Sequence, residues 1–195
     1  MIAAIILAAG QSTRMGSPKM VLPWGKQTVI GQVISVIITG GVDEILVVTG
    51  GAREEVENAV KDHPVRLVHN PQFASGEMLS TFQTGLSALG EKVTAALITL
   101  GDQPGIEPTV VHSVIQAYKT NHAAIVVPSY QMRRGHPWIL DRVLWSAALE
   151  LREPATLRDF LNQNADLITY LPVETGSILS DLDTPEDYER LRPNR

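Results

Sequence analysis

Glycines, a hydroxyl and two cationic side chains share one short segment near the start of the chain, residues 7–19. Gly10 and Gly16 permit tight turns, and successive backbone amides in such turns can form a nest that binds anions. Arg14 and Lys19 add two positive charges close by. Backbone amides combined with fixed cations indicate a binding site for a nucleotide triphosphate.

Two commoner phosphate-binding motifs do not match this segment. A P-loop requires Gly-x4-Gly-Lys-Ser/Thr, whereas five residues separate Gly10 from Gly16 and Lys19 comes later. The Gly-x-Gly-x-x-Gly fingerprint of dinucleotide-binding folds is absent. The alternative interpretation is a flexible polar loop. We favour a ligand site because the segment directly follows an apolar run, and ligands bind at the carboxyl ends of the strands in doubly wound sheets.

A carboxylate, Asp102, stands at the end of the most apolar run, in Leu-Gly-Asp-Gln-Pro at residues 100–104. At the tip of a parallel strand it would face the same crevice as the first loop. Mg²⁺ prefers one or two carboxylates together with substrate oxygens and water, so Asp102 is a candidate metal ligand. The alternative is an ordinary turn, because Asp and Pro also punctuate strand ends.

Two further acids, Asp181 and Asp183, lie two residues apart near the end of the sequence. In an extended chain they would share a face, and one of them could complete a metal site with Asp102. The competing interpretation is a helix N-terminus, because Thr184-Pro185 and the acids after it form a typical helix start.

A second cationic group is formed by Arg133 and Arg134, followed by Gly135 and His136. Two arginines beside a glycine suit a phosphate or a planar anionic ring. His136 could donate a hydrogen bond to a ligand or change its charge near neutral pH. We do not interpret it as a catalytic base, because a lone histidine is usually structural.

The elements that must position these residues follow from the hydrophobic pattern. Near-continuous apolar runs predict strands covered on both faces, as in a parallel sheet. Helical spacing between the runs predicts right-handed β-α-β crossovers, and therefore a doubly wound α/β fold with a mostly parallel sheet. Strands are predicted at 3–7, 45–49, 66–69, 95–100, 124–128, 137–140 and 167–171. Helices are predicted around 29–37, 53–61, 79–89, 110–118, 142–151 and 157–162, with a last one beginning at 184–187.

Composition narrows the class of protein. The chain has 195 residues, which suits one domain. With 16 basic against 21 acidic residues, a broad nucleic-acid surface is not expected. No cysteine is present, so thiolate chemistry is excluded. No stretch is apolar enough for a membrane span, and the apolar start lacks the basic residues of a signal peptide, so we expect a cytoplasmic protein.

The first segment resembles the signature Leu-Ala-Ala-Gly-x-Ser-x-Arg-Met-Gly-x-x-Lys of the MobA-like nucleotidyltransferases, and later segments extend the resemblance over nearly the whole chain. It implies a Rossmann-like fold of the nucleotide-diphospho-sugar transferase type, with one domain at 1–195. Relatives that transfer GMP typically have Ala-Gly or Gly-Gly before the glycine of this turn. Ala8 and Ala9 therefore favour the molybdenum cofactor cytidylyltransferases, although isoprenoid-pathway cytidylyltransferases share Ala-Ala-Gly.

The resemblance also implies roles for individual residues. The catalytic residues would be Arg14, Lys19 and Asp102. The nucleotide would be bound by Leu7, Ala8, Ala9, Gly10, Ser12, Arg14, Lys19, Asn70, Ser80 and Asp102. The acceptor would be bound by Arg134, Gly135 and His136. Mg²⁺ would be held by Asp102 and Asp183, with Asp181 as the alternative second ligand. The chain departs from the family pattern at Glu77, which separates Gly76 from Met78.

The reaction implied is transfer of CMP from CTP to the terminal phosphate of molybdopterin, with release of pyrophosphate. A molybdoenzyme or its chaperone would be a further partner. Two alternatives stay open: a cytidylyl or uridylyl transferase acting on a sugar or polyol phosphate, and a non-catalytic nucleotide-binding regulator.

Overall fold

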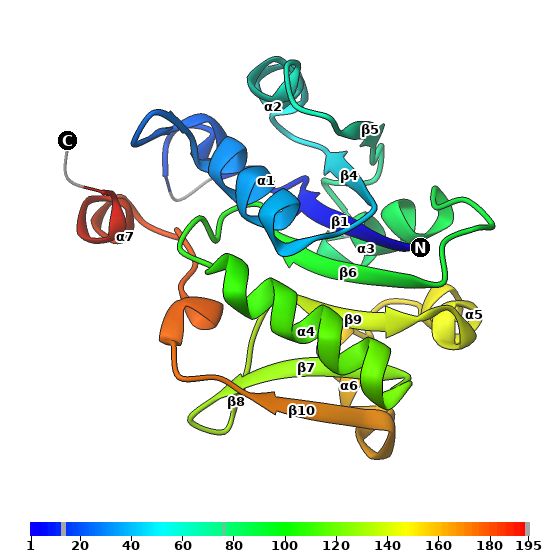
Figure 1. Cartoon of the computed structure of the whole chain (residues 1–195). Helices are drawn as coiled ribbons and strands as arrows, with labels where there is room; N and C mark the ends of the chain where they lie inside the picture. Colours follow the sequence, from blue (N-terminus) through cyan, green and yellow to red (C-terminus); the bar gives the residue numbers. More distant parts are fainter. Residues whose placement is uncertain (13–14, 76, 194–195) are drawn as a thin grey trace.

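The computed structural model describes residues 1–12, 15–75 and 77–193. In this part of the chain, eight strands form one sheet in the order β10-β7-β9-β6-β1-β4-β5, with β8 paired to β7 (Figure 1). These strands are β1 (Ile2–Ala8), β4 (Glu44–Thr49), β5 (Arg66–His69), β6 (Ala95–Leu100), β7 (Ile125–Tyr130), β8 (Arg133–Arg134), β9 (Trp138–Asp141) and β10 (Ile168–Pro172). A separate two-stranded sheet pairs β2 (Pro23–Trp24) with β3 (Gln27–Thr28).

Helices connect these strands. The α-helices are α1 (Val29–Gly40), α2 (Arg53–Val60), α3 (Glu77–Ser87), α4 (Pro108–Asn121), α5 (Trp145–Glu150), α6 (Leu157–Gln163) and α7 (Pro185–Leu191). Short 3-10 helices are η1 (Lys19–Val21), η2 (Arg142–Leu144), η3 (Ala165–Leu167) and η4 (Gly176–Leu179). None of the helices in the described part of the chain combines the length and the apolar character of a membrane span.

The predicted mostly parallel sheet is confirmed. Strand β1 pairs in parallel with β4 and β6, β4 with β5, and β7 with β10. The longer exception is β9, which runs antiparallel to both of its neighbours, β6 and β7. Its direction follows from the short connection that leads from β7 through β8 into β9, because a crossover to a parallel strand needs a longer segment.

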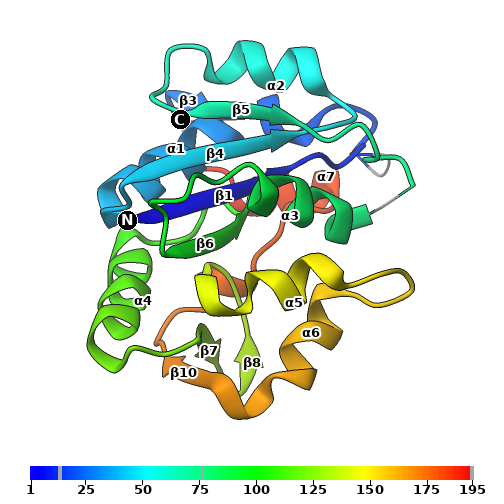
Figure 2. The ribbon, with the colours of Figure 1, turned by 90° about the vertical axis from the view of Figure 1, so that its right-hand side faces the viewer.

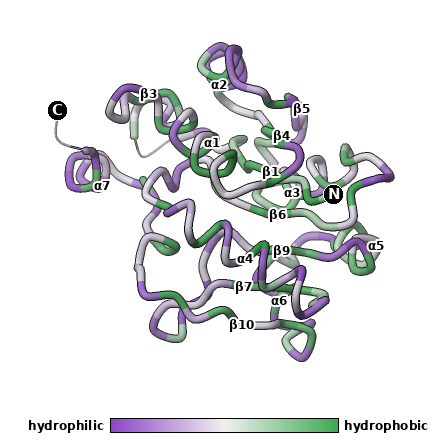
Figure 3. Tube along the Cα trace, viewed as in Figure 1, coloured by the Kyte–Doolittle hydropathy of each residue, from purple (hydrophilic) through white to green (hydrophobic). Residues whose placement is uncertain are grey.

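The sheet is covered by helices on both faces, which explains the continuous apolar runs. Figure 2 shows helices on either side of the strands. Helices α1, α2 and α4 pack with Ala4 and Ile6 of β1, whereas α3, α5 and α6 pack with Ala3, Ile5 and Leu7. Successive side chains of a strand point to opposite faces, so both sets are buried. Figure 3 shows the hydrophobic residues concentrated along β1 and β6.

Glycine sets the distance between α1 and α4. A Cβ atom at Gly40 would lie 2.2 Å from Cγ1 of Val111, well inside van der Waals contact. The two helices therefore pack with the backbone of α1 directly against the side chain of Val111.

The C-terminal segment packs against residues near the N-terminal end of the chain. Leu182 is fully buried and packs with Trp24 and Val29, and Tyr188 packs at the edge of the same cluster. The Tyr188 hydroxyl donates a hydrogen bond to the carbonyl of Pro23 at 2.5 Å. This docking brings the acidic residues on both sides of Leu182 next to the loop that follows β1.

Candidate active site

The carboxyl ends of β1 and β6 lie side by side, because Leu7 pairs with Leu100 in the sheet. The backbone amide of Gly101 donates to the carbonyl of Leu7 at 3.0 Å. A cavity of about 370 Å³ opens beyond these ends. It is lined by Leu7, Ala9, Gly10, Lys19, Met20, Phe73, Met78, Thr81, Leu100, Asp102, Asp181 and Asp183.

Lys19 joins three distant parts of the chain in this cavity. Its backbone amide donates to the hydroxyl of Ser12 at 3.1 Å, which fixes the start of η1 against the preceding loop. Its side-chain ammonium forms an ion pair with Asp102 and a second one with Asp183, where Nζ lies 3.1 Å from Oδ1. Segments around 12–19, 102 and 183 therefore converge on one cation.

The charges in this cavity shift one another's ionisation. Burial by itself lowers the pKa of the Lys19 ammonium, but attraction by Asp102 and hydrogen bonds to Asp102 and Asp183 raise it above its usual range. Burial raises the pKa of Asp181, and the negative charges of Asp102 and Asp183 add to that effect. Among the described lining residues, three carboxylates therefore surround one lysine.

The acidic segment at 181–183 is held from both sides. The side-chain amide of Gln103 donates a hydrogen bond to Asp181, and the backbone amide of Leu182 donates to the carbonyl of Asp102 at 3.1 Å. Leu182 points into the core, so Asp181 and Asp183 both face the cavity, as alternation in an extended chain predicts.

The sequence offered two interpretations of this segment, a pair of acids that face the cavity and a helix N-terminus. The structure contains both, on different residues. Thr184 is the N-cap of α7, and its hydroxyl accepts from the amide of Asp187 at 3.2 Å. The Asp187 carboxylate accepts in return from the Thr184 amide at 3.1 Å, completing a capping box. The helix start therefore uses Thr184 and Asp187, which leaves Asp181 and Asp183 available to the cavity.

The donor set of the cavity fits a hard divalent cation. The described residues contain no group of three or more His, Asp or Glu side chains arranged to hold a metal ion. However, Asp102 and Asp183 already share one cation, the Lys19 ammonium, between their oxygens. Mg²⁺ takes one or two carboxylates from a protein, the remaining ligands being water and substrate oxygens, so this pair fits it.

The residues predicted in the first loop divide into three groups. Leu7, Ala9, Gly10 and Lys19 line the cavity, and Ser12 supports Lys19 from behind. Ala8 is buried and is not among the described lining residues. A Cβ at Gly101 would lie 3.3 Å from the Cβ of Ala8, so small residues are needed at this crossing. Arg14 lies outside the described residues.

Asn70 and Ser80 support the wall of the cavity. Asn70 is 1% exposed, and its side-chain amide donates to the hydroxyls of Ser80 at 2.9 Å and Thr81 at 3.1 Å. Its carbonyl oxygen accepts from the backbone amide of Gln72 at 2.9 Å. Asn70 therefore fixes the first turns of α3 to the loop after β5, and the neighbouring Thr81 is the residue that reaches the cavity.

Sequence reasoning missed five residues of the cavity, namely the apolar Met20, Phe73, Met78 and Leu100 and the polar Thr81. Two signals were available. Met20 directly follows Lys19, and Leu100 precedes the Gly-Asp-Gln-Pro turn, so both had to lie near the polar groups. Phe73 gave no such signal, because only the fold brings the loop after β5 to this edge.

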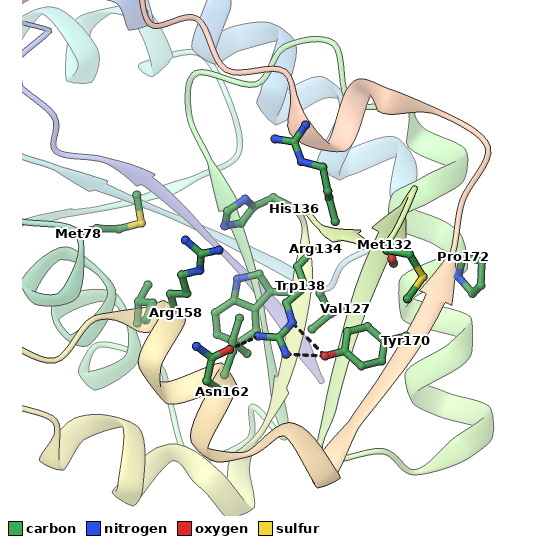
Figure 4. A pocket seen from close by; sticks show the side chains of 15 residues that line it. Met78, Val127, Met132, Arg134, His136, Trp138, Arg158, Asn162, Tyr170 and Pro172 are labelled. Atoms are coloured by element: carbon green, nitrogen blue, oxygen red, sulfur yellow. Dashed lines mark hydrogen bonds between the residues drawn. The ribbon is translucent and has the colours of Figure 1, made fainter.

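A second, larger cavity of about 890 Å³ lies beside the first, and the two share Met78. It is lined by Met78, Val127, Ser129, Met132, Arg133, Arg134, Gly135, His136, Trp138, Leu157, Arg158, Leu161, Asn162, Tyr170 and Pro172. Figure 4 shows its labelled side chains. The predicted acceptor-binding residues all belong to this second cavity.

Arg134 is held rigidly in the second cavity. Its Nε donates to the hydroxyl of Tyr170 at 2.9 Å, and its Nη1 donates to Oδ1 of Asn162 at 2.7 Å (Figure 4). These partners come from β10 and α6, so two other elements fix the guanidinium that β8 carries.

Gly135 and His136 form the wall nearest η4. A Cβ at Gly135 would lie 2.5 Å from the carbonyl oxygen of Ile178, so only glycine fits there. The backbone amide of His136 donates to the same carbonyl at 3.1 Å. Burial lowers the pKa of His136 to about 4, so its imidazole is neutral at pH 7 and adds no charge to the cavity.

The chain is similar in sequence and in structure to known proteins. The chain is 30% identical to nicotine blue oxidoreductase of Paenarthrobacter nicotinovorans, covering 97% of this chain and 96% of the relative. It is 26% identical to the molybdenum cofactor cytidylyltransferase of Escherichia coli K12, covering 96% and 93%. The crystal structure of Rv0371c from Mycobacterium tuberculosis H37Rv in complex with manganese superposes with a TM-score of 0.83 at 26% identity, covering 98% and 97%.

A family model also covers most of the sequence. It is described as the MobA-like NTP transferase domain, and it matches residues 4–167. The match includes the loop after β1, the end of β6 and the walls of the second cavity up to α6. The chain belongs to the family of MobA-like NTP transferase domains, and it is a nucleotidyltransferase of that family.

Proposed function

We propose that the protein transfers CMP from CTP to the terminal phosphate of a molybdopterin-type acceptor and releases pyrophosphate, acting as one domain over residues 1–195. The observation that carries the proposal is the Lys19 ammonium lying between Asp102 and Asp183. The two carboxylates could bind a metal ion, and the lysine and the glycine loop could bind the phosphates of a metal-bound triphosphate. The cationic cavity next to them could bind a second, anionic substrate. The named cytidylyltransferase relative supports the choice of nucleotide and acceptor.

The first loop and Lys19 would bind the triphosphate. Gly10 has open space where a side chain would stand, so phosphate oxygens can approach the backbone. Lys19 is the charged donor of the cavity, and it would hydrogen-bond the phosphates once it leaves the carboxylates. Negative charge that develops on departing pyrophosphate would then be stabilised by an ammonium already in place.

Asp102 and Asp183 would hold Mg²⁺, with Asp181 as the alternative to Asp183. When bound, the metal would neutralise phosphate charge and polarise a phosphoryl oxygen. The crystal structure of the relative Rv0371c is a complex with manganese, which supports the use of a divalent cation.

The attacking group would need no strong base. A phosphate is already anionic at pH 7, so its oxygen can attack the α-phosphorus in line once both substrates are positioned. The neutral His136 fits this view, because it can donate or accept a hydrogen bond without taking up a proton at neutral pH. Catalysis would therefore rest on positioning and on charge.

The test is a pyrophosphate-release assay with CTP, GTP or ATP, each combined with molybdopterin or with methylerythritol phosphate. The proposal predicts release with CTP and molybdopterin and little with other pairs. Release with the polyol phosphate would favour the sugar or polyol phosphate alternative. Nucleotide binding without release under any pair would favour the non-catalytic regulator and overturn the proposal.

A further inference from the structure

The two neighbouring cavities differ in the sign of their charge. The described lining residues of the first include three carboxylates and one lysine. The second contains three arginines, Arg133, Arg134 and Arg158, and no carboxylate among its described lining residues. In a chain with 16 basic and 21 acidic residues, such a gathering of arginines is a feature of the cavity and not of the composition. The second cavity is built to take an anion.

The arginines differ in how they are held. Both sides of the Arg134 guanidinium are engaged by Tyr170 and Asn162. Arg158 is exposed, and within the described part of the chain its guanidinium makes no hydrogen bond, although its charge attracts the neighbouring Asp159 carboxylate. Its donors are therefore available to a ligand, whereas Arg134 offers a fixed charge and a planar face.

Arg158 lies on the side of the second cavity that faces the acidic cavity. Arg158 and Met78 together line both the second cavity and a third one of about 560 Å³, and Met78 also lines the acidic cavity. In Figure 4, Arg158 lies between Met78 and Trp138, whereas Arg134 lies with Asn162 and Tyr170. An anionic group bound by Arg158 would therefore sit next to the shared wall.

The rest of the second cavity suits a flat, partly apolar body. Its lining includes Trp138, Tyr170, Leu157 and Leu161, and its volume of about 890 Å³ is in the range of sites for ligands much larger than a polyol. Arg134 lies with its guanidinium carbon 5.5 Å from the ring centroid of Tyr170, which extends an aromatic surface with a planar cation.

We propose that Arg158 is a specificity-determining residue for the acceptor, binding an anionic group of a planar heteroaromatic ligand at the end of the cavity nearest Met78. The ring system then lies toward Arg134 and Tyr170. This inference rests on the proposed function, because it assigns the second cavity to the acceptor, but it concerns ligand binding and makes no assumption about transfer.

The test uses pterin-6-carboxylate, a planar anionic heteroaromatic compound, and unsubstituted pterin as its uncharged counterpart. Binding to the full-length protein is followed by the intrinsic fluorescence of both compounds. We expect wild-type protein to bind pterin-6-carboxylate more tightly than pterin. Arg158→Gln should weaken binding of the carboxylate by about tenfold, the effect of losing a charge-assisted hydrogen bond, and leave pterin unchanged.

Two matched variants complete the design. Lys119→Gln removes the same charge from the exposed surface of α4, on the opposite face of the sheet, and should change neither affinity. Arg158→Lys keeps the charge and should retain part of the preference for the carboxylate. Equal binding of both compounds by wild-type protein, no binding of either, or unchanged binding by Arg158→Gln would each overturn the inference.

Titration of each variant with CTP separates this inference from the proposed function. Arg158→Gln should bind CTP as wild-type protein does, because Arg158 does not line the acidic cavity. Failure of wild-type protein to bind CTP would count against the transferase, whereas the fluorescence result bears only on Arg158.

Discussion

Lys19 and Asp183, 164 positions apart in the chain, meet with 3.1 Å between Nζ and Oδ1. Asp102 pairs with the same ammonium and is 9% exposed, so this lysine neutralises a largely buried carboxylate. A divalent cation binding to both carboxylates would have to displace the ammonium. If the proposed metal site is correct, Lys19 and the metal would compete for the same carboxylate oxygens until a bound triphosphate offers phosphate oxygens to both.

Competition for these oxygens leads to opposite effects of Lys19→Ala on two measurements. Pyrophosphate release should fall by about 100-fold or more, because a charged donor to the phosphates is lost. Affinity for Mn²⁺ without nucleotide, measured by electron paramagnetic resonance, should rise several-fold. Lys26→Ala, at an exposed turn position, should change neither. Weaker Mn²⁺ binding in Lys19→Ala would contradict the competition.

Asp102→Asn should strongly weaken metal binding while preserving the fold. Asparagine keeps the shape of the side chain but removes the charge that a divalent cation requires. Mn²⁺ affinity and pyrophosphate release should each fall by about 100-fold, with an unchanged circular dichroism spectrum. Asp166→Asn, at an exposed position in η3, is the control. Activity surviving in Asp102→Asn would remove this residue from the metal site.

Tyr170→Phe should weaken binding of the acceptor and leave binding of CTP unchanged. The hydroxyl of Tyr170 accepts hydrogen bonds from Arg134, and its loss frees that guanidinium to move. We expect the KM for the acceptor to rise by about three- to tenfold, the effect of a lost hydrogen bond to a charged group, with kcat and the KM for CTP unchanged. Asn162→Ala should behave in the same way. A fall in kcat without a change in KM would argue against a positioning role.

Gly40→Ala should lower the free energy of unfolding by about 1–3 kcal/mol, the usual effect of overpacking. The added methyl would collide with Val111 across the contact between α1 and α4. Val111→Ala removes Cγ1, the nearest atom at 2.2 Å, but keeps Cβ at 2.6 Å. The double variant should therefore regain only part of what the two single variants lose together. Urea unfolding of the four proteins measures the coupling, and strict additivity would show that the contact is not the cause.

Stability should fall as the pH is lowered from about 6.5 toward 4 because of His136. Its pKa in the folded protein is lowered from 6.5 to about 4, so the unfolded chain takes up the proton first as the pH falls. The folded state then loses about 1–2 kcal/mol, since the side chain is only half-buried. His136→Gln should lack this contribution, and the difference between the two proteins isolates it. Parallel pH profiles would exclude it.

Most of the fold was predictable, because its elements are defined by local patterns. Strands β5 and β6 occur at the predicted residues 66–69 and 95–100, and the other main-sheet strands except β8 differ from prediction by one or two residues at their ends. The direction of β9 was not predictable from apolar spacing, which is the same for parallel and antiparallel strands. The hairpin of β2 and β3 is too short to leave a periodic signal.

The candidate site was predictable where chemistry is concentrated in sequence. The convergence of Lys19, Asp102 and Asp183 agrees with the predicted crevice. Arg158 and Tyr170 were not identified, because each is a single residue in an ordinary amphipathic or extended segment. Asn70 was predicted to touch nucleotide, but its side-chain groups are engaged by Ser80, Thr81 and Gln72. A sequence shows that a polar residue is present without showing which neighbour satisfies it.

Because β9 runs antiparallel to its neighbours, the two cavities are lined by different stretches of the chain, and each stretch can vary in sequence without altering the other cavity. Because β9 runs against β6, its first residues reach the edge where Asp102 lies, so Gly135 and His136 enter the site ahead of a strand. Loops that follow β1 and β6 line the acidic cavity, which we propose for the nucleotide, and residues within 129–138 and 157–172 line the second cavity, which we propose for the acceptor. If those two stretches were exchanged between homologous proteins, the acceptor preference should change while the residues proposed to bind the nucleotide stay the same. Enzymes with different second substrates could arise from one ancestor in this way.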